Sequence, residues 1–127
     1  MNTTTLLRTA ALLGAMAVAL GAFGAHALKE TLAANQRTDT YELAVRYHFY
    51  HALALAITAL LPAGYHTKRL RLASWAFLAG IVLFSGSLYL LSLTGIRIFA
   101  FVTPAGGAAF IAGWLLLFSA LTKKAAR

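Results

Sequence analysis

Several side chains that could do chemistry lie within long apolar stretches of this sequence. Polar groups are costly to place inside a membrane, so they normally face the interior of a helix bundle or mark a functional site. Imidazole groups also suit zinc, copper and haem iron as ligands. The residues selected as candidates for a polar pocket are His26, His51, Ser85, Ser87, Tyr89 and Arg97.

Two of these candidates lie at matching depths if the stretches around them are membrane helices. At a rise of about 1.5 Å per residue, His51 lies roughly 12 Å below Leu43, where its predicted span begins, and Ser85 lies roughly 12 Å from Leu93, where the next predicted span ends. Ser85, Tyr89 and Ser92 share one helix face at spacings of four and three residues. We therefore predict a hydrogen-bonded cluster of His51 with this serine and tyrosine face.

Three functional readings compete for this cluster. The first is a metal or haem site formed by His26, His48 and His51, but the apolar stretches contain no carboxylate to support it. The second is a small transporter or channel. Coupled transporters usually carry Asp or Glu at mid-membrane, whereas all three acidic residues of this chain lie outside the stretches. The third is a pocket for a lipid headgroup, a quinone or another amphiphile, with Arg46 and Arg97 at its rim.

The simplest alternative is that these polar residues only satisfy one another inside a small bundle. The sequence contains no cysteine, no nucleophile with a base and an orienting group, no phosphate-binding loop and no dinucleotide fingerprint. We therefore predict no catalytic residue, no metal and no cofactor. The predicted function is an accessory or structural membrane protein, or a binder of a lipid-like amphiphile in an outer-leaflet polar pocket. A small transporter or channel is the alternative.

The elements that must position these residues are stretches without Asp, Glu, Lys or Arg, at residues 9–28, 47–67, 72–96 and 98–122. Each is long enough for a membrane helix, which needs about 20 apolar residues. Charged residues make up 11% of the chain, against roughly 25% in a soluble domain. We predict an all-α fold, a transmembrane four-helix bundle in one domain of residues 1–127, with spans at about 9–28, 43–63, 72–93 and 104–122.

Local signals mark the ends of these spans. Asp39 and Glu42 have the spacing of a capping box, and Glu42 lies four residues before Arg46, in the order that favours an ion pair. Thr103 followed by Pro104 predicts the N-cap and the first helical residue of the fourth span. Glycines and alanines at spacings of three and four along the first and fourth spans predict close helix packing, within one chain or between copies.

The distribution of basic residues predicts the orientation in the membrane. Seven of the eleven Lys and Arg residues lie near the N-terminus, in the loop 64–71 and in the C-terminal tail, and four lie in the opposite connectors. The positive-inside rule then places both termini in the cytoplasm. Expected partners are membrane lipids, and a homo-oligomer or an unidentified membrane protein stays open. Nucleic acid is not expected, because the basic residues lie at span ends and not on one face.

Several short motifs in a fixed order carry a family resemblance. They are GAFGAH at 21–26, Tyr47 with HALA at 51–54, FSGSLY at 84–89, Arg97, AFVTP at 100–104, the pair Gly106 and Gly107, and the pair Gly113 and Trp114. In this order and spacing, over about residues 14–118, the chain resembles the YgdD-like family of small four-span integral membrane proteins, a domain family of unknown function.

The resemblance implies four spans in a bacterial inner membrane, with the first span retained, and it supplies no reaction. His48 departs from the family pattern, in which a glutamine is familiar, and this weakens the metal reading. The positions that the resemblance picks out as motif members are His26, His51, Ser85, Ser87, Tyr89, Arg97, Thr103 and Pro104.

Overall fold

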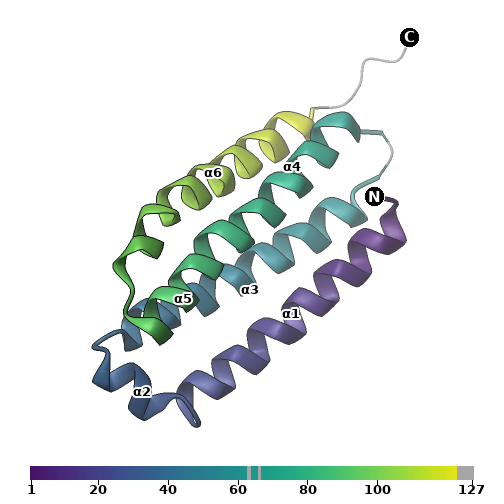
Figure 1. Ribbon diagram of the computed structural model, residues 1–127. Helices are drawn as coiled ribbons and strands as arrows, with labels where there is room; N and C mark the ends of the chain where they lie inside the picture. The colour runs from purple at the N-terminus through teal and green to yellow at the C-terminus, as the bar shows by residue number, and fades with distance from the viewer. Residues whose placement is uncertain (63, 66, 123–127) are drawn as a thin grey trace.

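The computed structural model describes residues 1–62, 64–65 and 67–122. These residues form an elongated bundle of helices (Figure 1), and no strand occurs among them. The elements are α1 (Thr3–Ala25), α2 (Lys29–Ala34), α3 (Thr38–Leu60), α4 (Thr67–Gly80), the π-helix η1 (Ile81–Ser85), α5 (Gly86–Thr94), the 3-10 helix η2 (Arg97–Phe101) and α6 (Thr103–Ala120).

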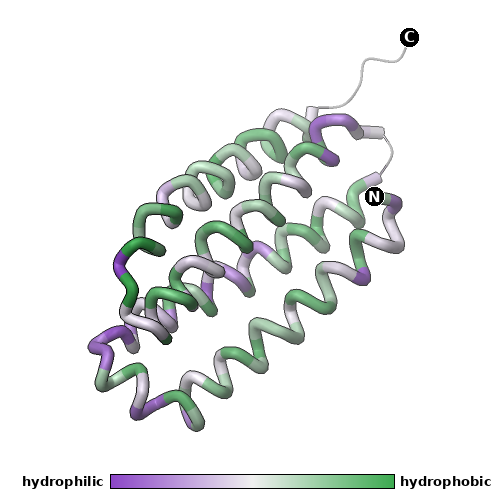
Figure 2. The backbone as a smooth tube through the Cα atoms, viewed as in Figure 1, coloured by the Kyte–Doolittle hydropathy of each residue, from purple (hydrophilic) through white to green (hydrophobic). Residues whose placement is uncertain are grey.

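Among the residues that the structure describes, three helical segments are long and apolar enough to cross a membrane. They are Thr3–Ala25, which is α1; Thr67–Thr94, in which α4, η1 and α5 follow one another; and Arg97–Ala120, which joins η2 to α6. Hydrophilic residues gather toward the two ends of the bundle, in α2 at one end and at the start of α4 at the other (Figure 2). The predicted all-α membrane fold is confirmed.

The remaining long helix, α3, has 23 residues but carries polar side chains along its first half, including Arg46, His48 and His51. It packs against α1, α4, η1 and α5, and nine of its residues are buried, against three in α1, which has the same length. Its neighbours therefore shield His48 and His51, which are buried, from lipid, where they would be costly, whereas Arg46 is exposed. The assignment of α3 as a membrane span, the second of the four in chain order, stays a prediction.

The helix starts differ from the predicted ones. α1 begins at Thr3, well before the predicted start, because the Asn2 side chain accepts a hydrogen bond from the Thr5 N–H at 2.8 Å. α3 begins at Thr38, and no side chain caps it. The predicted cap by Asp39 is therefore wrong: the backbone is already helical there, and Asp39 lies in the first turn.

Glycines let α6 approach the α4–η1 segment closely. A Cβ at Gly106 would collide with the backbone of Leu83 and Phe84, and a Cβ at Gly113 would lie 2.6 Å from the ring of Phe77. In a membrane, lipid gives helices no hydrophobic reason to associate, so close backbone packing of this kind stabilises the pair. The small-residue packing predicted for the fourth span therefore occurs within one chain.

The glycines of α1 differ in how closely α3 approaches them. Gly24 faces the ring of Tyr41, leaving no room for a Cβ, and the Tyr41 hydroxyl donates to the Leu20 carbonyl oxygen at 2.6 Å. A Cβ at Gly21 would also contact α3, whereas Gly14 has no such neighbour within 4 Å. Ala10 and Ala17 of the predicted strip are buried, so this face of α1 packs against the bundle on both sides of Gly14, and Gly14 itself leaves open space.

The π-helical turn at Ile81–Ser85 interrupts the third predicted span between Gly80 and Gly86. One extra residue in a turn rotates the following residues by about 100° around the helix axis. The two halves of this span accordingly face different neighbours: α4 packs mainly against α6, and α5 packs against α3 and α2.

Asn35 ties the connector helix α2 to the end of α5. Its Nδ2 donates to the carbonyl oxygens of Ser92 at 2.9 Å and Leu93 at 3.2 Å, groups that a helix end leaves unsatisfied. We expect Asn35→Ala to cost about 1 kcal/mol in the free energy of unfolding and to speed amide hydrogen exchange in α2, measured by mass spectrometry in micelles. Asn35→Asp keeps the size and loses the donors, so it should act alike; native exchange in both variants would contradict the tie.

Candidate functional site

His51 lies within a cluster of aromatic side chains contributed by α3, α4, η1 and α6, and it is 4% exposed. The Phe110 ring stacks on the imidazole with a centroid separation of 3.5 Å and an interplanar angle of 11°. Phe77 and Trp114 approach it with centroids 5.7 Å and 6.0 Å away. The members of this aromatic cluster are Tyr47, His51, Phe77, Phe84, Phe110 and Trp114.

Both imidazole nitrogens of His51 have partners. Nδ1 lies 2.7 Å from the Tyr47 carbonyl oxygen, which can only accept, so Nδ1 carries the hydrogen and donates it. Nε2 then accepts a hydrogen bond from the Trp114 indole N–H at 3.1 Å. The two contacts define one neutral tautomer and join α3 to α6. They leave neither nitrogen of His51 available to a metal.

The predicted cluster of His51 with the face of Ser85, Tyr89 and Ser92 is wrong. The Ser85 hydroxyl donates to the Ala44 carbonyl oxygen at 2.9 Å, about two helical turns from His51. Ser92 donates within its own helix at 2.7 Å. Both serines are fully buried, as expected, but matching depths did not determine which side of each helix faces the other.

Tyr89 pairs with His48 instead of His51. Its hydroxyl lies 3.1 Å from His48 Nδ1, and its ring packs edge-on against Tyr41 with centroids 5.2 Å apart. His48 is 2% exposed. Within the described part of the chain, its Nε2 is the one buried side-chain nitrogen or oxygen without a hydrogen-bond partner. The described residues include no group of three His, Cys, Asp or Glu side chains that could hold a metal ion.

The other candidates lie apart from one another. Ser87 is buried, and its hydroxyl lies 2.7 Å from that of Thr103, joining α5 to the start of α6. His26, at the end of α1, and Arg97, at the start of η2, are both exposed. The six predicted site residues therefore divide into packing contacts and exposed helix ends.

In the part of the chain that the structure describes, a cavity opens at each end of the bundle, and none of the six candidates lines either of these cavities. The α1–α3 cavity, of about 260 Å³, lies near α2 and contains Arg46, one of the two arginines predicted at the rim of a pocket. Its full lining is Gly21, Gly24, Ala25, Leu32, Thr38, Tyr41, Glu42, Val45 and Arg46.

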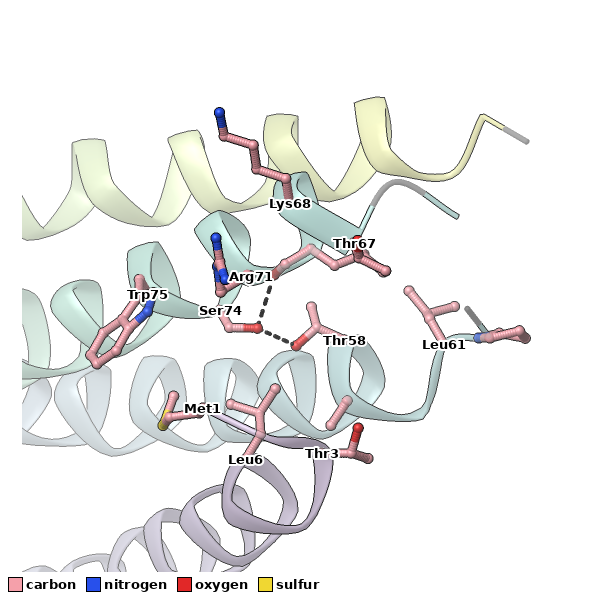
Figure 3. A pocket seen from close by; sticks show the side chains of 13 residues that line it. Met1, Thr3, Leu6, Thr58, Leu61, Thr67, Lys68, Arg71, Ser74 and Trp75 are labelled. Atoms are coloured by element: carbon pink, nitrogen blue, oxygen red, sulfur yellow. Dashed lines mark hydrogen bonds between the residues drawn. The ribbon is translucent and has the colours of Figure 1, made fainter. Parts of the chain in front are cut away.

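The second cavity, of about 480 Å³, lies where α1 begins, α3 ends and α4 begins (Figure 3). Lys68 and Arg71 stand on its α4 wall, so we call it the basic cavity. Thr58 and Ser74 meet inside it, with their hydroxyl oxygens 2.9 Å apart.

The sequence analysis did not predict two of these features, the contact between Trp114 and His51 and the basic cavity. Trp114 lies ten residues after Pro104, roughly 15 Å along the fourth span, so the same depth comparison could have paired it with His51. An indole N–H within a membrane span also needs an acceptor, because no water is available there. The basic cavity has no local motif, because the start of α1 forms it together with the distant end of α3 and start of α4.

Comparison with known proteins gives a consistent family. Residues 20–107 match the family described as "Protein of unknown function (DUF423)". The UPF0382 membrane protein SH2409 of Staphylococcus haemolyticus is 46% identical over 102 residues, covering 80% of this chain and 82% of the relative. The UPF0382 membrane protein YwdK of Bacillus subtilis is 44% identical over 109 residues, covering 85% and 88%.

The UPF0382 inner membrane protein YgdD of Escherichia coli is 43% identical over 114 residues, covering 85% of this chain and 82% of the relative. No solved structure matches the chain. The resemblance inferred from the motifs is thus confirmed, and so is the assignment as a membrane protein without an established activity. The chain belongs to the DUF423 family of membrane proteins of unknown function.

Proposed function

We propose that this protein binds an amphiphile whose headgroup carries both a negative and a positive charge, in the α1–α3 cavity. The observation that carries this proposal is that Arg46 and Glu42 line the cavity together. They lie one turn apart on α3, and both side chains are exposed. A guanidinium suits a phosphate through its planar set of donors, and a carboxylate accepts hydrogen bonds from an ammonium. A phosphoethanolamine headgroup offers these two groups side by side.

The rest of the lining suits the apolar part of the same ligand. Gly21 and Val45 form walls without polar side-chain atoms, and Leu32 of the connector helix closes one side. α1 also presents Phe23 and Val18 outward, 56% and 62% exposed, as expected for a helix face in contact with acyl chains. A lipid could therefore place its headgroup at Arg46 and keep its tails in the bilayer.

The proposed orientation puts this cavity in the outer leaflet. α1 begins and α6 ends at the same end of the bundle (Figure 1), as a chain with four spans requires. With α3 as the second of four spans, the excess of Lys and Arg at the end where the chain begins favours a cytoplasmic location for both termini. The α1–α3 cavity, at the opposite end, then opens toward the outer surface of the inner membrane.

None of the six candidates from the sequence lines the α1–α3 cavity. We assign packing roles to His51, Ser85, Ser87 and Tyr89, whose polar groups bind other groups of the bundle. His26 at the end of α1 and Arg97 at the start of η2 are exposed and would meet lipid headgroups at the membrane surface.

A binding role is favoured over the alternative of a transporter or channel. Between the two cavities, the described residues include a well-packed layer with Leu55, Phe77 and Phe110, which are 0%, 0% and 3% exposed. Such a layer separates the cavities, whereas transport needs a polar path through both leaflets.

Photo-crosslinking in vesicles tests the proposal. A phosphatidylethanolamine probe, with a photoreactive group on the acyl chain near the glycerol, should form adducts that peptide mapping locates at the end of α1 and the start of α3. Removing a charge-assisted contact costs about 1.5–3 kcal/mol, so Arg46→Gln should lower adduct yield about tenfold or more. Arg37→Gln removes a neighbouring charge outside the cavity lining and should leave the yield unchanged.

Glu42→Gln provides the test of the positive headgroup charge. It should remove the preference for phosphatidylethanolamine over phosphatidylglycerol probes while adducts still form at the same peptides. Equal yields in Arg46→Gln and Arg37→Gln, or adducts spread along every helix, would contradict the site.

A further inference from the structure

We infer that the basic cavity is a second and separate binding site, which takes the phosphodiester of an anionic lipid headgroup. Lys68 and Arg71 line it, and the chain has no acidic residue at this end of the bundle to balance them. Its three acids are Glu30, Asp39 and Glu42, which lie in α2 and in the first turns of α3. The cavity therefore carries uncompensated positive charge.

Arg71 is the better placed of the two basic residues. It lies on α4 one turn before Ser74, close to the floor of the cavity, whereas Lys68 extends away from that floor (Figure 3). Arg69 lies between them in the sequence but belongs to a different contact, because its Nη1 donates to the Ser119 carbonyl oxygen at 2.7 Å. Arg69 does not line the cavity, so Arg71 supplies its main anion-binding group.

The floor of the cavity accepts hydrogen bonds. Thr58 donates to the Leu55 carbonyl oxygen at 2.7 Å, and Ser74 approaches the Leu70 carbonyl oxygen at 3.0 Å. The two hydroxyls also lie 2.9 Å apart, so these three contacts share the two hydroxyl hydrogens and leave none free. What remains on Thr58 and Ser74 is lone pairs, which accept but do not donate. A ligand with a hydroxyl next to its phosphate, as in phosphatidylglycerol, fits both the floor and Arg71.

The walls favour a lipid over a free anion. Leu6 of α1 and Leu61 after α3 contribute apolar surface, and Trp75, which is 52% exposed, stands on α4 at the edge of the cavity. Tryptophan is enriched at the boundary between headgroups and hydrocarbon. A lipid whose phosphate binds Arg71 would therefore have its acyl chains directed past Trp75 into the bilayer.

Isothermal titration calorimetry in micelles tests this inference with short-chain phosphatidylglycerol, short-chain phosphatidylcholine and sodium phosphate. We expect phosphatidylglycerol to bind the wild-type protein more tightly than phosphatidylcholine, and its dissociation constant to rise about tenfold in Arg71→Gln. Arg69→Gln removes the same charge next to the cavity and should leave the constant unchanged.

Each other outcome would overturn the site. Equal weakening in Arg71→Gln and Arg69→Gln would mean that a diffuse surface charge attracts the lipid. Binding of sodium phosphate with no preference between the two lipids would mean that the cavity takes a soluble anion. The site does not depend on the α1–α3 cavity, and Arg46→Gln, which changes that cavity, should therefore leave this titration unchanged. Either proposal can thus fail without the other.

Discussion

Gly106→Ala should lower the free energy of unfolding by about 3 kcal/mol, because the added methyl group has no place to go. A Cβ at Gly106 would meet the backbone of Leu83 and Phe84. A side chain can rotate away from such a collision, but the backbone of a packed helix can move only with the helix. α6 would have to separate from the π-helical segment, and the contacts along both helices would weaken. Unfolding by SDS in mixed micelles measures the loss.

The neighbouring glycine is the matched control for this prediction. A Cβ at Gly107 would lie 3.8 Å from the ring of Phe84, which is an ordinary contact distance. Gly107→Ala changes the same residue type in the same turn of α6 and also gains helix propensity, so its stability should stay within about 1 kcal/mol of the wild type. Similar losses in both variants would show that the close approach at Gly106 is not what holds α6.

His51→Ala should cost about 3 kcal/mol in the free energy of unfolding, from two separate losses. The stacked contact with Phe110 disappears, and the Trp114 indole N–H is left without its acceptor. Aromatic pairs contribute about 0.5–1.5 kcal/mol beyond burial, and a donor left unpaired away from water, as within a membrane span, costs about 1–3 kcal/mol.

A double-mutant cycle separates these losses. His51→Phe retains a ring against Phe110 but removes the acceptor, and Trp114→Phe removes the donor. Hydrogen bonds between membrane helices average below about 1 kcal/mol and reach about 1.7 kcal/mol, so we expect a coupling energy of about 1 kcal/mol between His51→Phe and Trp114→Phe. A coupling energy near zero would mean that the Trp114 contact contributes nothing to stability.

The sequence predicted the class of fold because the physics of the bilayer constrains it strongly. Long uncharged stretches must form helices in hydrocarbon, since each backbone polar group needs a partner within its own segment. The cap at Asp39 was misplaced because the start of α3 depends on how α2 docks, through Asn35, on α5. That contact joins residues 57 positions apart, and no local pattern reveals it.

The candidate site was predicted less well, because counting residues gives the depth of a side chain but not the direction in which it points. Depth along a span follows from counting residues, and it correctly indicated that His51 and Ser85 are buried. Rotation about the helix axis does not follow from counting when a π-helical turn intervenes at Ile81–Ser85. Ser85 therefore reaches Ala44, and His51 finds Trp114. The cavities depend on three or more segments meeting at a helix end, which a single sequence does not encode locally.

Native mass spectrometry of protein released from its own membrane in mild detergent would show whether an amphiphile occupies the α1–α3 cavity. We expect one added mass per chain in that cavity, identified by fragmentation as a lipid with a zwitterionic headgroup. This mass should be retained in Arg37→Gln and lost in Arg46→Gln, whose side chain lines the cavity. A wild-type chain without that lipid, or one that keeps it fully in Arg46→Gln, would contradict the claim.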